Sequence, residues 1–416
     1  MAELHPISTS SKPPEHTTRW QIVSAAPHRP MFLLGATQLV LVMVLWVGEL
    51  LARWLGAPLP FVVPSTWAHV VLMLYGVYTF FIFGFLFTVF PRWMNGSEVP
   101  RRRYMSVAVT AAAGMALTYL GFFTDTFLLA AGLALHLLAW LGAIFLLFNV
   151  YRGAQKRRVH ERLLLMALTF GAVGLGAFIY ATVANSGAAF ALARDVGLWG
   201  FLLPVLLTVC HRMIPFFTQS ALATVNLPRI DWSLGWFVGG SLLHGFFEIT
   251  SQPVGRLVVD TALAALALRH TVVWGLTRSF RVRLLAMLHI AFLWFGIAMS
   301  LYAIGTAFSL LGTGIFGRAP LHALGIGFVT STLIAMATRV TLGHSGRALA
   351  VKAPTWYLFL GISVVALLRI AAERAPVGAY QWLSLVAAAA WLACLVPWAF
   401  RYAPIYWRPR VDHKPG

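Results

Sequence analysis

The stretch that decides the fold is "PLHALGIGFVTSTLIAMATRVTLGHSGRAL", residues 320–349. Its first part is almost entirely apolar, and no acidic side chain occurs anywhere in it. A continuous run of about 20 apolar residues is the length that an α-helix needs to cross the hydrocarbon core of a bilayer. The sequence therefore predicts a transmembrane helix with one histidine near its start, His322, and another just beyond its end, His344.

Runs of the same kind recur along the whole chain. Of the 416 residues, 60% are hydrophobic and only 12 are acidic, a composition that a soluble core of this length does not need. We therefore predict an all-α polytopic membrane protein with about twelve transmembrane helices. The expected spans are residues 31–52, 65–90, 105–124, 126–150, 163–184, 196–217, 232–249, 256–277, 284–311, 320–341, 355–372 and 379–400.

The uneven distribution of basic residues predicts the orientation of the chain. The net charge is +19, and most of the 31 lysines and arginines fall in loops on the same side as the two termini. Those on the opposite side are Arg53, Arg194, Arg256, Arg318, Arg369 and Arg374. Because cytoplasmic loops are enriched in lysine and arginine, we expect cytoplasmic tails at 1–30 and 401–416, on either side of a transmembrane domain at 31–400.

Three classes of protein are disfavoured by simple features of the sequence. The first 30 residues are polar and show no secretory signal. No loop is long enough for a basic nucleic-acid-binding domain. Ion-coupled transporters generally need carboxylates near the middle of the membrane, whereas the acidic residues that approach the spans here lie near their outer ends, namely Glu49, Asp125, Glu248, Asp260 and Glu373.

The two cysteines and the many histidines bear on metal binding. Cys210 and Cys394 fall inside expected spans, so we expect no disulfide framework and interpret both as small apolar packing residues. For Cys210, beside His211, soft metal ligation is the alternative. Imidazoles on membrane helices with few acidic partners favour metal or haem ligation over simple hydrogen-bonded packing. The histidines within spans are His69, His136, His211, His244, His270, His289 and His322.

Depth in the membrane separates these histidines into two predicted sites. His344 lies 22 residues after His322. At about 1.5 Å per helical residue this distance is about 33 Å, so the two cannot bind the same metal. His69 and His322 match in depth and form the expected outer site. The residues expected at the inner site are His289 and His344, with His28 and His211 in reach.

The outer pair is suited to a low-spin b-type haem. Two neutral imidazoles on different helices can bind one iron from opposite faces. Gly76 lies seven residues after His69, on the same helical face, and Gly325 and Gly327 follow His322. Glycines at these positions would let a flat macrocycle approach the helix backbone. Ordinary helix packing through small residues is the alternative interpretation.

A recurring pattern at the inner end predicts an internal repeat. Arg92, Arg212 and Arg339 close the second, sixth and tenth spans, so similar features return at every fourth span. This spacing favours three four-helix units. The three guanidinium groups could hold carboxylates such as haem propionates, or they could be ordinary cytoplasmic anchors. Gly343 and Gly346 let the chain turn out of its helix, which places His344 where the membrane ends.

Four stretches, in the right order and together spanning most of the chain, resemble the NnrS family. They are "HVVLMLYGVYTFFIFGFLFTVFPRWM" (69–94), "RMIPFFT" (212–218), "MLHIAFLWFGIA" (287–298) and "PLHALGIGFVTSTLIAMATRVTLGHSGRAL" (320–349). The resemblance implies a protein of the bacterial inner membrane that contains haem and copper and is linked to nitric oxide and nitrosative stress. It also implies that the family histidines are His69, His289, His322 and His344.

The chain departs from the family pattern at two places. Many members read "WHAHEM" where this chain reads "WAHVVLM", so Val71 replaces a histidine. Members commonly read "GGRMIP" where this chain reads "CHRMIP", so His211 is an addition. The three-unit pattern is also similar to the catalytic subunits of haem–copper oxidases and nitric oxide reductases. However, no adjacent His-His pair is present, so we do not expect a binuclear centre of that type.

These features together indicate a haem-binding membrane protein, with copper as a second metal, that acts on or senses nitric oxide. As an enzyme it would be an oxidoreductase that passes electrons from a quinol, through the outer haem, to an inner metal site made by His289, His344 and His211. His244 and Glu248, four residues apart on one helical face, would be a point of proton access or a local hydrogen-bonded pair. The alternatives are a non-catalytic protein that binds or delivers haem or copper, and a secondary transporter.

Overall fold

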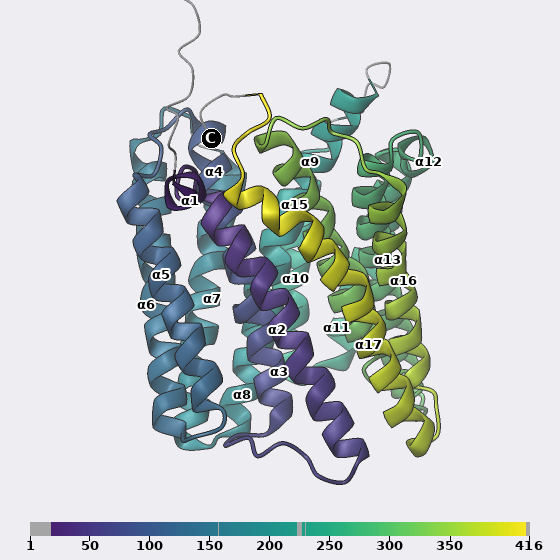
Figure 1. Cartoon of the computed structure of the whole chain (residues 1–416). Helices are drawn as coiled ribbons and strands as arrows, with labels where there is room; N and C mark the ends of the chain where they lie inside the picture. The colour runs from purple at the N-terminus through teal and green to yellow at the C-terminus, as the bar shows by residue number, and fades with distance from the viewer. Residues whose placement is uncertain (1–17, 157, 223–226, 229, 413–416) are drawn as a thin grey trace, which may run out of the picture.

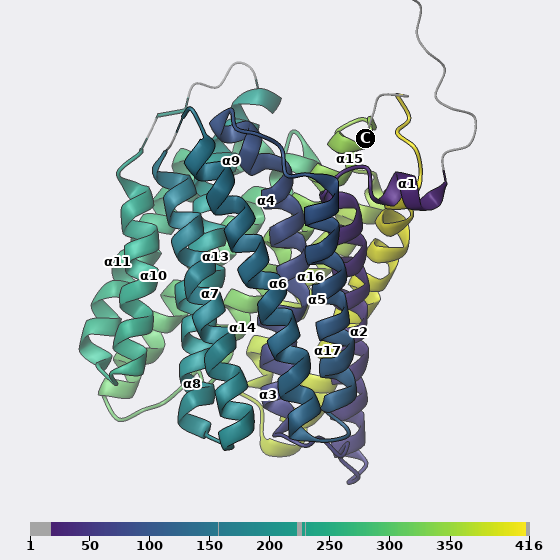
Figure 2. The same ribbon diagram turned by 90° about the vertical axis from the view of Figure 1, so that its left-hand side faces the viewer.

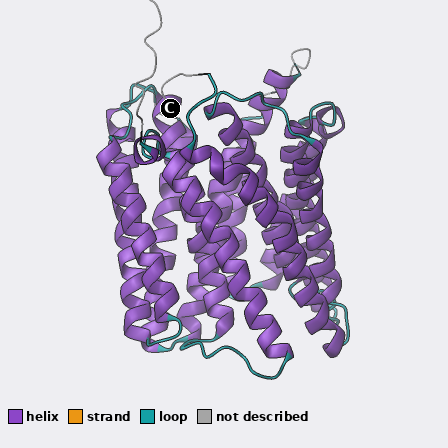
Figure 3. Cartoon of the chain, viewed as in Figure 1, coloured by secondary structure: helices purple, strands orange, loops and turns teal. Residues whose placement is uncertain are grey.

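The structure, a computed structural model, describes residues 18–156, 158–222, 227–228 and 230–412. In this part the chain forms helices and loops and no strand (Figure 3). The α-helices are α1 (Arg19–Val23), α2 (His28–Trp54), α3 (Ser65–Val71), α4 (Tyr78–Met94), α5 (Arg101–Gly121), α6 (Thr126–Gly153), α7 (Val159–Ala184), α8 (Gly187–Asp195), α9 (Leu203–Ala221), α10 (Ser233–Ile249), α11 (Pro253–Val273), α12 (Leu276–Ser279), α13 (Arg283–Leu310), α14 (Ala319–His322), α15 (Ser331–His344), α16 (Ala353–Ala372) and α17 (Val377–Tyr402). The predicted all-α fold is confirmed.

The long helices stand side by side in one bundle, and both described ends of the chain lie at the same end of it (Figure 1). We call this the terminal end and the opposite one the far end. The last described residues are fixed there by hydrogen bonds. The Val411 N–H donates to the carbonyl of Ser345 (3.1 Å), and Arg29 donates to the carbonyls of Tyr406 (3.3 Å) and Arg408 (2.9 Å). The C-terminal segment therefore covers the start of α2 and the end of α15.

Within the described residues, ten helical stretches are long and apolar enough to cross a membrane. The other two expected spans, 232–249 and 256–277, are helices as well, α10 and α11. They fall short of that standard, since α10 has 17 residues and α11 carries Arg256, Asp260 and Arg269. Both stand beside the longer helices (Figure 2). The fold thus contains every expected helix, but α10 and α11 depend on packing against the bundle more than on apolar length.

Three of the spans contain a π-helical segment. These segments are η1 (Leu72–Val77), η2 (Val196–Leu202) and η3 (Ala323–Thr330), and a single 3₁₀ segment, η4 (Ala403–Trp407), follows α17. Each π segment directly follows a short α-helix at the far end, namely α3, α8 or α14. They occur in the second, sixth and tenth expected spans. The recurrence at every fourth span has the spacing of the predicted three-unit pattern, and π segments frequently mark functional sites.

Glycines bring the backbones of α5 and α6 into contact. A Cβ atom at Gly132 would lie 2.5 Å from the backbone nitrogen of Thr118, and one at Gly114 would lie 2.6 Å from that of His136. Membrane helices gain little from burying apolar side chains against each other, because lipid is equally apolar. Close backbone approach through small residues provides the packing energy instead.

Replacing Gly132 with alanine should therefore destabilise the bundle. We expect a penalty of about 1–3 kcal/mol, because backbone atoms cannot move aside as a flexible side chain can. The measurement is thermal unfolding of detergent-solubilised protein followed by circular dichroism. The matched control is Gly142→Ala on the same helix, where the nearest atom is a Val107 methyl at 3.7 Å. Equal melting temperatures for the two variants would contradict this account of the packing.

Candidate cofactor site

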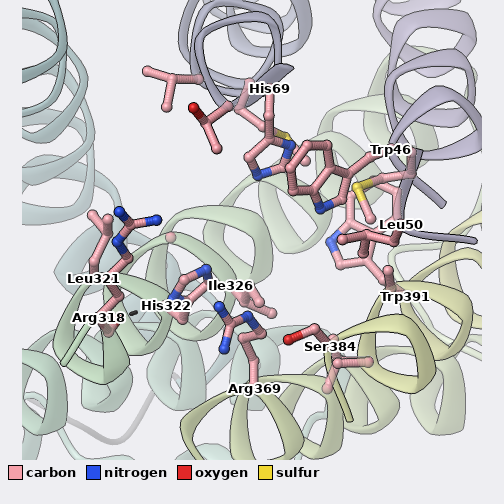
Figure 4. A pocket seen from close by; sticks show the side chains of 18 of the residues that line it. Trp46, Leu50, His69, Arg318, Leu321, His322, Ile326, Arg369, Ser384 and Trp391 are labelled. Atoms are coloured by element: carbon pink, nitrogen blue, oxygen red, sulfur yellow. Dashed lines mark hydrogen bonds between the residues drawn. The ribbon is translucent and has the colours of Figure 1, made fainter. Parts of the chain in front are cut away.

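His69 and His322 line the same cavity near the far end. His69 lies in the last turn of α3, three residues before η1 begins, and His322 is the last residue of α14, directly before η3. The cavity has a volume of about 460 Å³ and is walled mainly by apolar and aromatic side chains of α2, η1, η3 and α17. Figure 4 shows the two imidazoles on neighbouring walls, with Trp46 beside one and Arg369 beside the other.

The hydrogen bonds of the two imidazoles leave nitrogen atoms available to a ligand. Nδ1 of His322 lies 2.9 Å from the carbonyl oxygen of Arg318. A carbonyl only accepts, so Nδ1 carries the hydrogen and Nε2 keeps its lone pair. The ring of His69 stacks on Trp46 with ring centroids 4.1 Å apart, and its Nδ1 is buried without a hydrogen-bond partner. Such an unsatisfied atom indicates a partner that the polypeptide does not supply.

Four arginines also line this cavity, and sequence reasoning did not assign them to a site. They are Arg53, Arg194, Arg318 and Arg369. Three of them pair with carboxylates, Arg53 with Glu49 at 2.6 Å, Arg194 with Asp195 at 2.7 Å and Arg369 with Glu373 at 2.8 Å. The spacing of Arg318, one helical turn before His322, is the signal that could have found one of them.

Of the three glycines considered for contact with a cofactor, only Gly325 lines the cavity. A Cβ atom there would meet nothing within 4 Å. Gly76 instead faces α5, where a Cβ would lie 3.5 Å from the sulfur of Met115, and Gly327 packs against Trp294. The π turn of η1 starts three residues after His69, so the α-helical spacing used for Gly76 does not hold there.

Arg92, Arg212 and Arg339, which were expected to hold one carboxylate together, lie at the terminal end in different surroundings. Arg212 pairs with Glu161 at 2.9 Å and lies over the ring of Trp93 at 4.2 Å from its centroid. Arg339 lies over the ring of Phe217 at 3.7 Å. Arg92 is exposed. The expected convergence of Arg92, Arg212 and Arg339 on one carboxylate is therefore not what the structure shows.

The terminal end brings His28 and His344 together. Their ring centroids are 4.7 Å apart with an interplanar angle of 41°. His28 is 3% exposed, and its Nδ1 has no hydrogen-bond partner. Arg410 donates to the carbonyl oxygen of His344 at 3.0 Å, which fixes the end of α15. The structure thus brings together two of the four histidines expected at the inner site, although His344 meets His28 and not its expected partner His289.

The other two histidines expected there have different neighbours. His289 Nε2 lies 2.9 Å from the hydroxyl of Thr218. His211 contacts His160 at 3.2 Å and Ser233 at 3.1 Å. Sequence reasoning had placed His160 in a loop and had not considered it. Among the described residues, no group of three or more His, Cys, Asp or Glu side chains is arranged to hold a metal ion.

Two further histidines have partners within the protein. The ring nitrogens of His136 each lie 3.1 Å from a backbone carbonyl oxygen, one of Ala111 on α5 and one of Tyr75 in η1. A neutral imidazole carries a single N–H, so His136 donates to one of these two carbonyls. His244 does not pair with Glu248 as expected. It contacts Asp260 on α11 at 2.5 Å, because its side chain points at the neighbouring helix rather than along its own.

Comparison with known proteins now gives the family and the fold. The profile described as "NnrS protein" matches residues 22–410. The chain belongs to the NnrS family. No curated protein sequence matches this member.

Among solved structures, eight chains match, and one is a haem–copper terminal oxidase determined as a dimer by cryo-electron microscopy. The TM-score is 0.63 at 12% identity, and the alignment covers 95% of this NnrS protein and 86% of the oxidase chain. At this identity the likeness shows a common fold and no more. The predicted resemblance to that fold is confirmed.

Proposed function

We propose that this NnrS protein binds haem b between His69 and His322 and acts in nitric oxide metabolism. The observation that carries the proposal is the meeting of two histidines, from two distant spans, at one cavity bordered by arginines. Family membership supports the link to haem and nitric oxide. The shared fold with a haem–copper oxidase supports a haem between these helices.

The cavity has the chemistry that a haem requires. Apolar and aromatic walls suit the macrocycle. His322 Nε2 and the nitrogens of His69 supply donors for iron. Arg53, Arg318 and Arg369 lie on the cavity wall and can bind the propionate carboxylates through charge-assisted hydrogen bonds. We assign this far end to the outer side of the bacterial inner membrane, because most basic residues lie in loops at the terminal end.

The position of each ligand determines what the site can do. A haem held by both His69 and His322 would supply one-electron transfer. The stack of Trp46 on His69 and the bond from His322 to the Arg318 carbonyl hold the two rings in fixed orientations. Nitric oxide would therefore bind elsewhere, and we assign it to a metal, copper or a second haem iron, held by His28 and His344.

A second candidate function is non-catalytic binding or delivery of haem or copper. It is favoured by one observation, namely that the terminal-end histidines form a pair rather than a group of three ligands within the described residues. A binding protein needs no electron path between its two sites, whereas a reductase needs a donor such as a quinol. Turnover therefore separates the two candidates.

Replacing either ligand at the far-end cavity should abolish the low-spin haem. We expect His69→Ala and His322→Ala to lose the sharp reduced-minus-oxidised bands, because each removes one of the two imidazoles that would hold the haem. The measurement is optical spectroscopy of purified protein, with haem content determined in parallel. The matched control is His344→Ala, which should keep these bands. Retention of the bands in both far-end variants would exclude this site.

Filling the cavity should reduce haem content without unfolding the protein. A leucine at Gly325 would project into open space within the cavity, and we expect several-fold less haem to co-purify, since the side chain occupies the volume of the ring. The measurement is haem per protein after purification. The control is Gly176→Leu, where open space also surrounds a Cβ but which does not line this cavity. A normal haem content in Gly325→Leu would contradict the assignment.

Nitric oxide consumption should depend on the terminal-end pair. With a reduced quinone analogue under anaerobic conditions, wild-type protein in vesicles should consume nitric oxide, and His344→Ala should lose most of this activity while keeping its low-spin bands. The measurement uses a nitric oxide electrode. If wild-type protein binds nitric oxide spectroscopically but does not consume it, the non-catalytic candidate is the correct one.

A further inference from the structure

At the far end, α10 and α11 carry two charged pairs that lie one helical turn apart. The shallower is Arg256 with Glu248, where α10 ends and α11 begins. The deeper is His244 with Asp260. Glu248 follows His244 by four residues and Asp260 follows Arg256 by four, so both pairs lie along the same two helix faces. The shallow pair is partly exposed, whereas the side chains of the deep pair are only 1% and 0% exposed.

The deep pair is not fully satisfied by the protein. Nδ1 of His244 and Oδ1 of Asp260 are 2.5 Å apart, a short charge-assisted hydrogen bond. The other carboxylate oxygen, Oδ2 of Asp260, is buried and has no partner. Ionisable side chains buried this fully in a membrane protein are costly, and they usually mark a path for ions or protons. With one hydrogen the pair has a net negative charge, and with a second it is neutral.

The same segment of chain forms a wall of the far-end cavity and a wall of this pair. The ring of His244 stacks on Trp199 in η2, with centroids 3.4 Å apart, and η2 also contributes Leu198 and Leu202 to the cavity lining. Arg194, just before η2, lines the cavity too. The π-helical segment η2 therefore contacts His244 and also lines the proposed haem site.

The charged groups around the pair are paired with each other, so the charge that can change here is the proton of the His244–Asp260 pair itself. Tyr302 of α13 lies edge-on to His244, with centroids 5.0 Å apart. The groups that interact electrostatically with His244, Asp260 or Tyr302 are Arg256, Asp195 and Arg194. Arg256 is paired with Glu248, and Arg194 with Asp195. Negative charge added to the cavity would therefore be felt across a wall of low polarity and would favour protonation of the pair.

We propose that His244 and Asp260 form a proton-binding site coupled to the far-end cavity, and this inference rests on the proposed haem function. For each electron that a donor of the quinol class delivers to the cavity, the pair binds up to one proton from the aqueous phase at the far end. The proton arrives past Glu248 and Arg256 and is released again when the electron leaves. The negative charge of the electron in the cavity is therefore compensated by the proton on the His244–Asp260 pair.

The experiment is a redox titration of the haem absorption of purified protein over a range of pH. Reduction coupled to proton binding is favoured by acid, so the wild-type midpoint potential should fall as the pH rises. Asp260→Asn should lose most of this pH dependence, since an amide keeps the contact with His244 but cannot bind the proton. His244→Gln is the second variant. The matched control is Asp125→Asn, an exposed carboxylate at the start of α6 that belongs to neither site and should retain the wild-type dependence.

The outcomes distinguish this inference from the function on which it rests. A wild-type pH dependence in both Asp260→Asn and His244→Gln, each with normal haem bands, would overturn the coupled proton site and leave the haem assignment intact. If wild-type haem bands persist in His69→Ala and His322→Ala, both proposals fail together. Loss of the pH dependence in the deep-pair variants, but not in the control, supports the inference.

Discussion

A bilayer supplies no hydrogen-bond partners, and this constraint governs how polar groups are arranged throughout the bundle. His136 meets it by donating to a backbone carbonyl, that of Ala111 or that of Tyr75, and Trp140 and Trp398 meet it by donating to Thr79 and Thr338. Against this background a buried nitrogen or oxygen without a partner is informative. Such atoms occur at the far-end cavity, at the terminal end and between α10 and α11, and they include His69 Nδ1, His28 Nδ1 and Asp260 Oδ2.

Apolar length was enough to predict the helices, and depth along them was enough to predict that His69 and His322 lie at one level while His344 lies at another. What the sequence could not give was the direction in which each side chain points. A helix that is apolar on all sides has no amphipathic pattern to orient it. Gly76 was therefore assigned to the wrong face, and His289 and His211 to a shared site they do not form. The π segments also left no recognisable signal.

The fold is that of haem–copper oxidases, but the distribution of side chains is this protein's own. The cavity at the far end combines two histidines with four arginines. In the sequence these arginines are among the few basic residues expected on the side opposite the termini. The pair at the terminal end is separated from it by the length of η3 and α15. In the function proposed here, one end therefore holds an electron carrier and the other a gas-binding metal.

One helix touches both of these places. α2 is a continuous helix of 27 residues, with His28 against His344 at one end and Trp46 against His69 toward the other. Its Gly35 packs so closely on α4 that a Cβ would lie 2.6 Å from the ring of Phe81, so it has little freedom to slide. α2 is therefore a rigid connection between the two histidine pairs. A change of tilt at the terminal end, where the C-terminal segment binds Arg29, would also displace Trp46 against His69 at the far end.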